Sequence, residues 1–364
     1  MTVATDDTYA AYLACRKGKR SAVSCIEFET DLVANLARLT RQINDRTWQP
    51  QSHMCFVVLN PKPREIWASP FADRVVHHVA YQALRHRFEP QWIASTFACI
   101  PKRGTGAACK WAEDAARKIT AGWTRPAWVL QADIANCFPS IDRHMMADML
   151  LERSPEPWLR HLISEVVNVD VTDGAHFPGD PTLLDMIPPH KSLWHAPPGK
   201  GLPIGNLTSQ FGANVYLDRI DQAAVRGRWA RHYGRYVDDM LMLDESRDRL
   251  EVALHHLTEA LNGLGLQLHP DKTHLKPVTA GFDFAGRFVL PHRSYLRRAT
   301  VRRAANAINQ LDNNDHPAET VTSYLALARQ VNGYTLRSSW AQRAAPTLKV
   351  DPNLTTASLP GGPP

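Results

Sequence analysis

The stretch of sequence that decides the fold runs from Tyr233 to Leu243 and reads Tyr-Gly-Arg-Tyr-Val-Asp-Asp-Met-Leu-Met-Leu. Short apolar runs lie on both sides of an Asp-Asp pair, which is typical of two antiparallel strands joined by a tight turn. We therefore predict a β-hairpin with Asp238 and Asp239 at its tip. Such a pair does not identify a site by itself, because a second one occurs at residues 6–7, where we expect a solvated terminus.

A third acid follows a strand about 105 residues earlier in the chain. Residues 128–132 read Trp-Val-Leu-Gln-Ala, which predicts a buried strand that ends at Asp133. If one sheet brings this acid beside Asp238 and Asp239, the three like charges repel one another and raise their own pKa values. Two Mg²⁺ ions, with Mn²⁺ as a substitute, would offset that repulsion and support phosphoryl transfer. The alternative is an ordinary turn whose acids are solvated.

The rest of the pattern predicts an α+β protein. We expect strands over 56–59 and 128–132 and in the hairpin, and a long loop over 172–200, which is rich in Pro and Gly. Apolar residues at helical spacing predict helices in most of 1–50, and over 71–88, 209–226 and 250–264. Ser140 is the expected N-cap of a further helix that ends near Leu151.

The positive charge is concentrated late in the chain. Of 364 residues, 44% are hydrophobic and 21% charged, and the net charge is +6. Residues 293–349 hold nine basic and three acidic side chains, so the remainder balances at 33 against 33. We predict that this basic segment is helical, with an apolar face of Val301, Ala304, Ala305, Ile308 and Leu311. Arg298, Arg302 and Arg303 then project from the opposite face toward a polyanion, unless that face is simply solvated.

Other features restrict the class of protein. No run of about 18 apolar residues or basic-then-apolar leader is present, so we expect a cytoplasmic protein that does not enter a membrane. Six cysteines without a CxxC pair favour reduced thiols. The histidine pairs at 77–78 and 255–256 are expected at exposed helix positions rather than in metal sites, because adjacent helical side chains diverge.

With these elements in place, the chain resembles a bacterial reverse transcriptase. The YxDD box is matched by Tyr236-Val-Asp-Asp239, and the first catalytic motif of the palm by Gln131-Ala-Asp-Ile-Ala-Asn-Cys-Phe-Pro-Ser-Ile-Asp142. The lysine motif is matched by Leu264-Gly-Leu-Gln-Leu-His-Pro-Asp-Lys-Thr273, and the primer grip by Phe282-Asp-Phe-Ala-Gly286. The fingers motifs are matched by Lys62-Pro-Arg64, Asp73-Arg74 and Cys99-Ile-Pro-Lys-Arg-Gly104.

This resemblance implies a right-hand polymerase fold. We expect N-terminal helices and fingers over 1–125 and a palm over 126–292 that contains the 172–200 loop as an insertion. A basic helical thumb would follow over 293–349, and 350–364 would form a disordered tail.

The resemblance also implies roles for individual residues. Asp133 and Asp238 would hold both metal ions, with Asp239 assisting and the backbone carbonyl of Ile134 as a further ligand. Lys272 would protonate or neutralise the departing pyrophosphate. The residues expected to contact the incoming deoxynucleoside triphosphate are Lys62, Arg64, Phe138, Ile204, Gly205 and Gln210. Phe138 occupies the place of an aromatic gate against a ribose 2′-OH, and the thumb arginines would grip the template–primer duplex.

One motif departs from the usual pattern of the family. Gly201-Leu-Pro-Ile-Gly-Asn-Leu-Thr-Ser-Gln210 stands where most reverse transcriptases carry a Gln-Gly-x-x-x-Ser-Pro box. Ile204 in place of Gln, and Gln210 in place of Pro, resemble the enzymes of diversity-generating retroelements, which make error-prone cDNA from a template RNA. That resemblance implies a small basic helical accessory protein, pentameric in the family, as a partner. The chain ends soon after the expected thumb, which argues against an intron-encoded enzyme.

Two other interpretations stay open on the sequence. The protein could be a phage-defence or retron-like reverse transcriptase, because the Ile-Gly-x-x-x-Ser-Gln box can recur in other lineages. It could also be a catalytically inert RNA-binding protein on a polymerase fold, although all three candidate metal-binding acids are present.

Overall fold

The computed structural model describes residues 2–60, 62–311 and 318–348. The expected tail at 350–364 lies outside these residues. The chain divides into two compact units, each assembled from separate stretches of sequence. The first unit comprises the described residues of Met1–Ala94, Ile134–Gly227 and His255–His269, and the second those of Ser95–Asp133, Arg228–Leu254 and Pro270–Pro364.

The first unit is mostly helical and is built around α4 (Phe71–Phe88), which packs against α1, α2, α8 and α9. The predicted apolar stripe of α4, from Phe71 to Phe88, is buried. The other helices are α1 (Thr5–Arg16), α2 (Val23–Glu29), α3 (Leu32–Asp45), α6 (Cys137–Ser140), α7 (Arg143–Leu151), α8 (Pro157–Asn168) and α9 (Leu207–Arg226). A short 3₁₀ turn, η1 (Glu89–Gln91), follows α4.

Strands β1 (Met54–Val58) and β2 (Arg64–Ala68) form an antiparallel pair in the first unit. The 172–200 segment, whose residues are all described, lies beside them as the predicted long loop and contains only the 3₁₀ turns η2 (Pro181–Met186), η3 (Pro189–Lys191) and η4 (Leu193–His195). Its backbone is fastened to β1, since Cys55 N donates to His176 O at 2.8 Å. Leu193 N donates to the Glu65 carboxylate of β2 at 2.9 Å.

Two local predictions in this unit were wrong. The N-cap of α7 is Asp142, whose carboxylate accepts from Met145 N at 3.0 Å, whereas Ser140 ends the separate helix α6. The chain is extended at Ile141 and so breaks what the sequence suggested was one helix. His77 is buried rather than exposed and its Nδ1 lies 2.6 Å from Thr208 Oγ1, because α9 packs against α4. Burial lowers the pKa of His77 to about 3.

The second unit contains a five-stranded sheet in the order β3-β5-β6-β4-β7. Its strands are β3 (Thr96–Phe97), β4 (Trp128–Asp133), β5 (His232–Tyr236), β6 (Asp239–Asp244) and β7 (His274–Pro277). Strand β4 lies between β6 and β7 and is antiparallel to both, while β3 and β5 are parallel. The predicted buried strand and hairpin are therefore confirmed, and the mixture of helices and sheets confirms the α+β class.

Helix α5 (Thr105–Ile119) packs on one face of this sheet. Its small residues Ala108, Ala112 and Ala116 are buried in one apolar cluster with Val129 and Leu241 of the sheet. At Gly234 of β5 an added Cβ would lie 2.4 Å from the Trp111 ring of α5. Only glycine allows this close approach of strand and helix.

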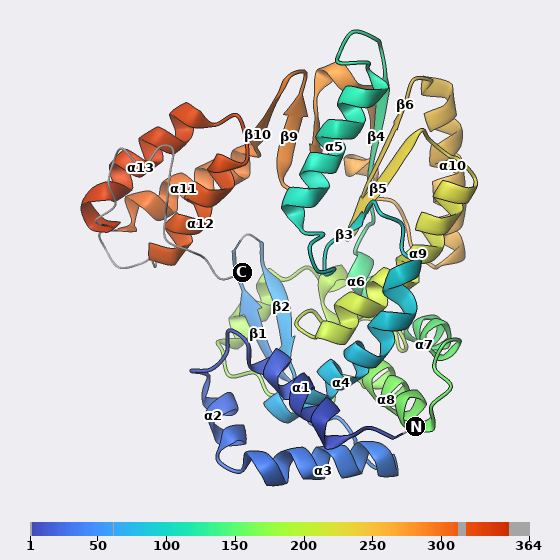
Figure 1. The fold of residues 1–364 in the computed structure, drawn as a ribbon, viewed down its shortest axis with the longest axis vertical. Helices are drawn as coiled ribbons and strands as arrows, with labels where there is room; N and C mark the ends of the chain where they lie inside the picture. The colour runs from blue at the N-terminus through green and yellow to red at the C-terminus, as the bar shows by residue number, and fades with distance from the viewer. Residues whose placement is uncertain (1, 61, 312–317, 349–364) are drawn as a thin grey trace. The chain divides into compact units, whose positions relative to one another are not determined.

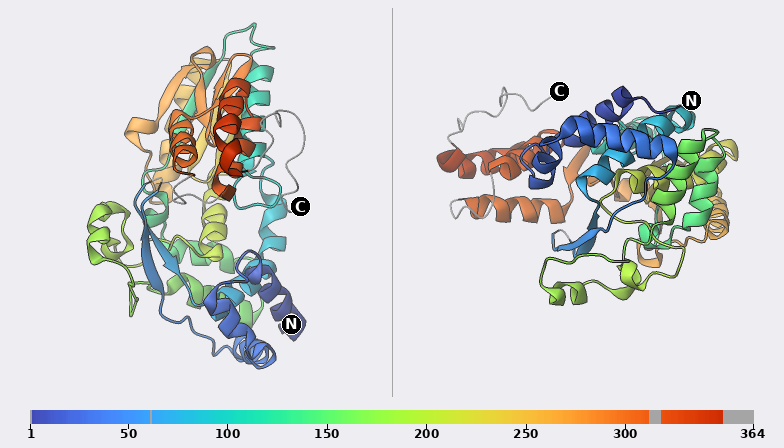
Figure 2. Two further views of the ribbon diagram at one scale, coloured as in Figure 1. Left: turned by 90° about the vertical axis from the view of Figure 1, so that its left-hand side faces the viewer. Right: turned by 90° about the horizontal axis from the view of Figure 1, so that it is seen from below.

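A three-stranded sheet and three helices complete the second unit. The strands, in the order β10-β9-β8, are β8 (Phe282–Phe284), β9 (Arg287–Leu290) and β10 (Arg293–Leu296). Three helices follow β10 and pack together around their own apolar core, namely α11 (Arg298–Asn309), α12 (Ala318–Arg329) and α13 (Tyr334–Leu348) (Figures 1 and 2). The turns η5 (Pro270–Lys272) and η6 (Val278–Ala280) flank β7, and α10 (Arg247–Gly263) is divided between the two units.

The helical segment begins later than the sequence predicted. Residues 293–296 are strand β10, because Ser294 and Leu296 point inward while they pair with β9. Helix α11 does bury the expected face at Ala304 and Ile308, and it also buries Ala307.

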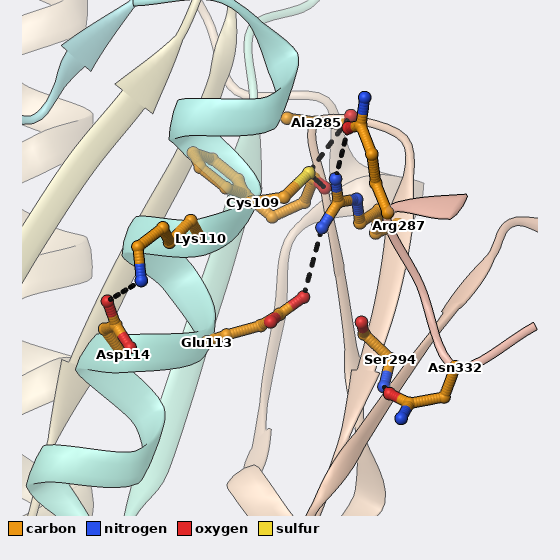
Figure 3. A network of polar contacts seen from close by, with 10 residues as sticks. Cys109, Lys110, Glu113, Asp114, Ala285, Arg287, Ser294 and Asn332 are labelled. Carbon is orange, nitrogen blue, oxygen red and sulfur yellow. Dashed lines mark hydrogen bonds and ion pairs between the residues drawn. The ribbon is translucent and has the colours of Figure 1, made fainter. Parts of the chain in front are cut away.

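A buried arginine links three elements of the second unit (Figure 3). Arg287 of β9 is 9% exposed. Its Nη2 donates to Gln330 Oε1 at 2.6 Å, and its Nη1 lies 3.4 Å from Glu113 Oε1 of α5. Nearby, Asn332 exchanges two 2.9 Å hydrogen bonds with the backbone of Ser294. Arg287 therefore fastens the end of α12 and the helix α5 to the three-stranded sheet.

We predict that Arg287→Met lowers the free energy of unfolding by about 2 kcal/mol, because the hydrogen bonds of a buried charged group to Gln330 and Glu113 are lost. Arg293→Met is the matched control at an exposed position on β10, and its effect should stay within about 0.5 kcal/mol. Urea unfolding of both variants measures the difference. Equal stabilities would contradict the role of Arg287 as a fastening point.

Candidate active site

The register of β4 on β6 brings two of the predicted acids together. Asp133, the last residue of β4, is directly opposite Asp239, the first residue of β6. Asp239 is also opposite Tyr236 of β5, so Val237 and Asp238 alone form the turn between the two strands. Three acids from two distant segments therefore lie at one end of the sheet, as the sequence indicated.

The electrostatic environment of Asp239 reflects this crowding. Burial is the largest influence and raises the pKa of Asp239 to about 6. The pKa of about 6 already includes the positive charges of Arg297 and Lys272, which lower it, and the negative charges of Asp133 and Asp238, which raise it. Asp239 therefore lies in the field of both neighbouring carboxylates, and the nearby positive charges favour its ionised form.

Two basic side chains contact the acids. Lys272 Nζ lies 2.5 Å from Asp133 Oδ2. Arg297, at the start of α11, places Nη2 3.6 Å from Asp239 Oδ2 and donates from Nε to Asp283 Oδ1 at 2.9 Å. The backbone carbonyl of Asp283 in turn accepts from Gln131 Nε2 of β4 at 2.7 Å. The site thus includes β8 and Arg297, the residue immediately before α11, as well as the hairpin.

Sequence reasoning missed the contacts of Arg297 and Asp283. In the sequence, Arg297 belongs to the basic segment and Asp283 to the Phe282–Gly286 motif. Nothing local to these residues indicates that Arg297 contacts both Asp239 and Asp283.

The donor atoms at this sheet end suit a hard divalent cation, because they are carboxylate oxygens whose mutual repulsion a cation would relieve. Within the described ranges, however, no group of three or more His, Cys, Asp or Glu side chains is arranged closely enough to surround a metal ion. Lys272 and Arg297 supply the positive charge in this arrangement.

The residues expected to contact the nucleotide lie in the first unit and are connected through its backbone. Trp67 N of β2 donates to Ile204 O at 2.8 Å, and Leu202 N donates to Phe138 O at 2.9 Å. The 201–210 segment therefore joins β2, whose first residue is Arg64, to the helix that carries Phe138. Lys62, Arg64, Gly205 and Gln210 are exposed, and Phe138 and Ile204 are partly buried.

Gly205 has a conformation that only glycine tolerates here. Its φ is +130°, and an added Cβ would lie 2.6 Å from the carbonyl oxygen of Trp67. The close approach of the 201–210 segment to β2 therefore requires glycine at this position.

The predicted nucleic-acid-binding residues Arg298, Arg302 and Arg303 are exposed on α11, on the side opposite its buried residues. This helix lies in the second unit, as do the three acids. Ile134, the predicted backbone ligand, is buried and directly follows Asp133.

Comparison with known proteins defines the family. Residues 61–287, more than half of the chain, match the family model described as reverse transcriptase (RNA-dependent DNA polymerase). The chain belongs to this family, whose members are nucleotidyltransferases that generally use divalent metal ions. It is also 21% identical over 268 residues to Protein YkfC of Escherichia coli (strain K12), and the match covers 65% of each chain. No helix in the described part of the chain has the length and apolar character needed to span a bilayer.

Asp73, from the predicted fingers motif, is fully buried in α4 of the first unit. One carboxylate oxygen accepts from Gln51 N at 2.7 Å, and the other has no hydrogen-bond partner. The neighbouring Arg74 donates from Nε to the carbonyl of Ser69 at 2.7 Å. Burial raises the pKa of Asp73 from 3.8 to about 6.

This shift predicts a pH dependence of stability. The native state keeps the Asp73 proton between pH 4 and 6 while the unfolded state loses it, so the free energy of unfolding falls as pH rises through this window. The fall amounts to about 3 kcal/mol at most. In Asp73→Asn this contribution should disappear, whereas in Asp45→Asn, an exposed control on α3, it should persist. Urea unfolding at pH 4, 5, 6 and 7 tests this, and an unchanged slope in Asp73→Asn would contradict it.

Proposed function

We propose that this protein is an RNA-directed DNA polymerase that copies a template RNA into cDNA by two-metal nucleotidyl transfer. The observation that carries the proposal is the pairing of Asp133 with Asp239 across β4 and β6, with Asp238 in the adjoining turn. Asp133 and Asp238 would hold Mg²⁺ or Mn²⁺ ions, with Asp239 and the Ile134 carbonyl assisting. When bound, these ions would supply charge stabilisation for the attacking and leaving oxygens.

Lys272 is the proposed partner of the leaving group. Its ammonium group already contacts the Asp133 carboxylate and is 48% exposed. A half-exposed cation of this kind can move between a carboxylate and a pyrophosphate at small cost, because exposed ion pairs contribute little free energy. Lys272 would then neutralise or protonate the departing pyrophosphate.

The first unit would bind the incoming nucleotide. Lys62 and Arg64 are exposed cations at and before the start of β2, suited to a triphosphate. Phe138 and the Ile204–Gly205 segment are connected to β2 through the backbone, and Gln210 lies at the end of the same segment. We propose that Phe138 excludes a ribose 2′-OH and that Ile204 lies beside the nucleotide.

Helix α11 would bind the template–primer duplex. Arg298, Arg302 and Arg303 lie on its exposed face and can neutralise phosphates without reading the sequence. Each neutralised phosphate adds about 0.9 to the salt dependence of binding to a DNA-like duplex. In this proposal the helices after β10 act as a right-hand thumb, with the palm over 126–292 and the fingers before it.

Primer extension with Mg²⁺ on an RNA template tests the acids. Asp238→Asn and Asp133→Asn should each lower kcat at least about 100-fold, because each removes charge stabilisation worth several kcal/mol. Asp6→Asn is the control, since Asp6 is an exposed residue of another Asp-Asp pair. Equal product from wild type and Asp238→Asn would refute the proposed site and would favour an RNA-binding protein without catalysis.

We further propose that the enzyme belongs to a diversity-generating retroelement and makes frequent errors at template adenines. The supporting feature is Ile204, which cannot donate or accept a hydrogen bond from its side chain and whose β-branched side chain is stiff. A small basic helical accessory protein, pentameric in that group, would be the partner. A phage-defence or retron-like enzyme is the alternative, and a template repeat next to a variable repeat in the genome would decide against it.

Ile204→Gln should lower the error frequency at template adenines several-fold, because the amide adds a polar contact of about 1 kcal/mol that depends on correct pairing. Ile204→Leu keeps the position apolar and should leave the error spectrum unchanged. Sequencing of cDNA made by the three proteins measures the effect. An identical spectrum in Ile204→Gln and wild type would remove Ile204 from the account of fidelity.

A further inference from the structure

The turn that carries Asp238 contains an unfavourable backbone conformation. Val237 has φ of +57°, in the left-handed region. A β-branched side chain is poorly tolerated there, and two-residue hairpin turns normally place Gly, Asn or Asp at such positions. Another part of the structure must therefore stabilise the turn in this form.

Arg235, two residues earlier, contacts this turn directly. Its Nη1 donates to the carbonyl oxygen of Val237 at 2.9 Å. The side chain is fully buried, and such charge-assisted hydrogen bonds are about twice as strong as neutral ones. The donor is thus shielded from water and aimed at the residue with the unfavourable φ.

The backbone of Arg235 is held on both sides. In β5 it pairs with Thr96 of β3 and with Met240 of β6, and its N–H donates to Ser95 O at 2.9 Å. Because β5 lies between β3 and β6, the backbone from which the Arg235 side chain extends cannot shift without disturbing the sheet. Arg235 is therefore a rigid support for the turn.

The hydrogen bond also constrains the neighbouring acid. The carbonyl of Val237 and the amide nitrogen of Asp238 belong to one planar peptide unit. Fixing the direction of that carbonyl therefore fixes the direction in which the Asp238 backbone leaves the turn. A freely rotating peptide here would let the Asp238 carboxylate take several orientations.

We infer that Arg235 is a positioning residue, which holds the Val237–Asp238 peptide so that Asp238 and Asp239 keep their catalytic orientation. This inference rests on the proposed roles of those two acids. Arg235 acts through the turn and does not itself touch substrate. The coupling between positions 235 and 237 is its measurable consequence.

A double-mutant cycle of Arg235→Met and Val237→Gly tests the coupling. In the wild-type background, Arg235→Met should lower kcat for primer extension about 10- to 100-fold, with KM for the nucleotide changed less than threefold. Glycine adopts positive φ without strain. In the Val237→Gly background, the fold-decrease in kcat caused by Arg235→Met should therefore be at least five times smaller than in the wild-type background. Arg231→Met, at an exposed position just before β5, is the matched control and should change kcat less than twofold in either background.

Thermal unfolding of wild type, the two single variants and the double variant of this cycle gives a readout that does not require activity. The decrease in Tm caused by Arg235→Met should be smaller by at least about 3 °C when residue 237 is changed to glycine. If Arg235→Met fails to fold, the double variant should recover folding. Coupling in Tm together with an inactive wild type would refute the polymerase proposal while supporting the contact between Arg235 and the turn. Additive effects in both measurements, or a double variant that stays unfolded, would overturn the inference.

Discussion

The antiparallel register of β4 on β6 is the constraint on which the candidate site depends. It places Asp133 opposite Asp239, and a shift by one residue would turn every side chain of one strand to the other face of the sheet. Val129 of β4 and Leu241 of β6 are buried in the same apolar cluster as α5, so a shifted register would remove one of them from this cluster. The burial of apolar side chains therefore fixes the distance between two acids that would otherwise repel each other.

Local sequence patterns were sufficient for the elements that carry the acids. Strand β4 and the hairpin are short apolar runs with clear ends, and their bounds could be predicted because the signal lies within about ten residues. The burial of His77 could not be predicted, since it results from the packing of α9 on α4. Strand β10 was also missed, because four residues gain strand structure only through pairing with β9.

The same distinction applies to the site. The three acids could be proposed from the sequence because each lies next to a recognisable strand. The contacts of Arg297 with Asp239 and Asp283 join residues from three separate strands and loops, and no periodicity indicates them. Buried Arg235 would also have been read as an exposed cation, since arginine is rarely buried completely. Its burial is explained by the position of β5 between β3 and β6 in the sheet and by its hydrogen bond to Val237.

The interactions at the acidic end of the sheet differ greatly in strength, and the difference suits catalysis. The pairs Lys272–Asp133 and Arg297–Asp239 involve cations that are 48% and 38% exposed, and such pairs contribute at most about 1 kcal/mol each. The strained conformation at Val237 costs about 1–3 kcal/mol. A hydrogen bond from a charged donor such as Arg235 contributes about 1.5–3 kcal/mol, so the free energy of this hydrogen bond is of similar size to the cost of the strain. The backbone that carries the acids is therefore firmly held, whereas the cations that neutralise them are released easily. Under the proposed function, a divalent cation or a polyphosphate would replace Lys272 and Arg297 while the strands keep their positions.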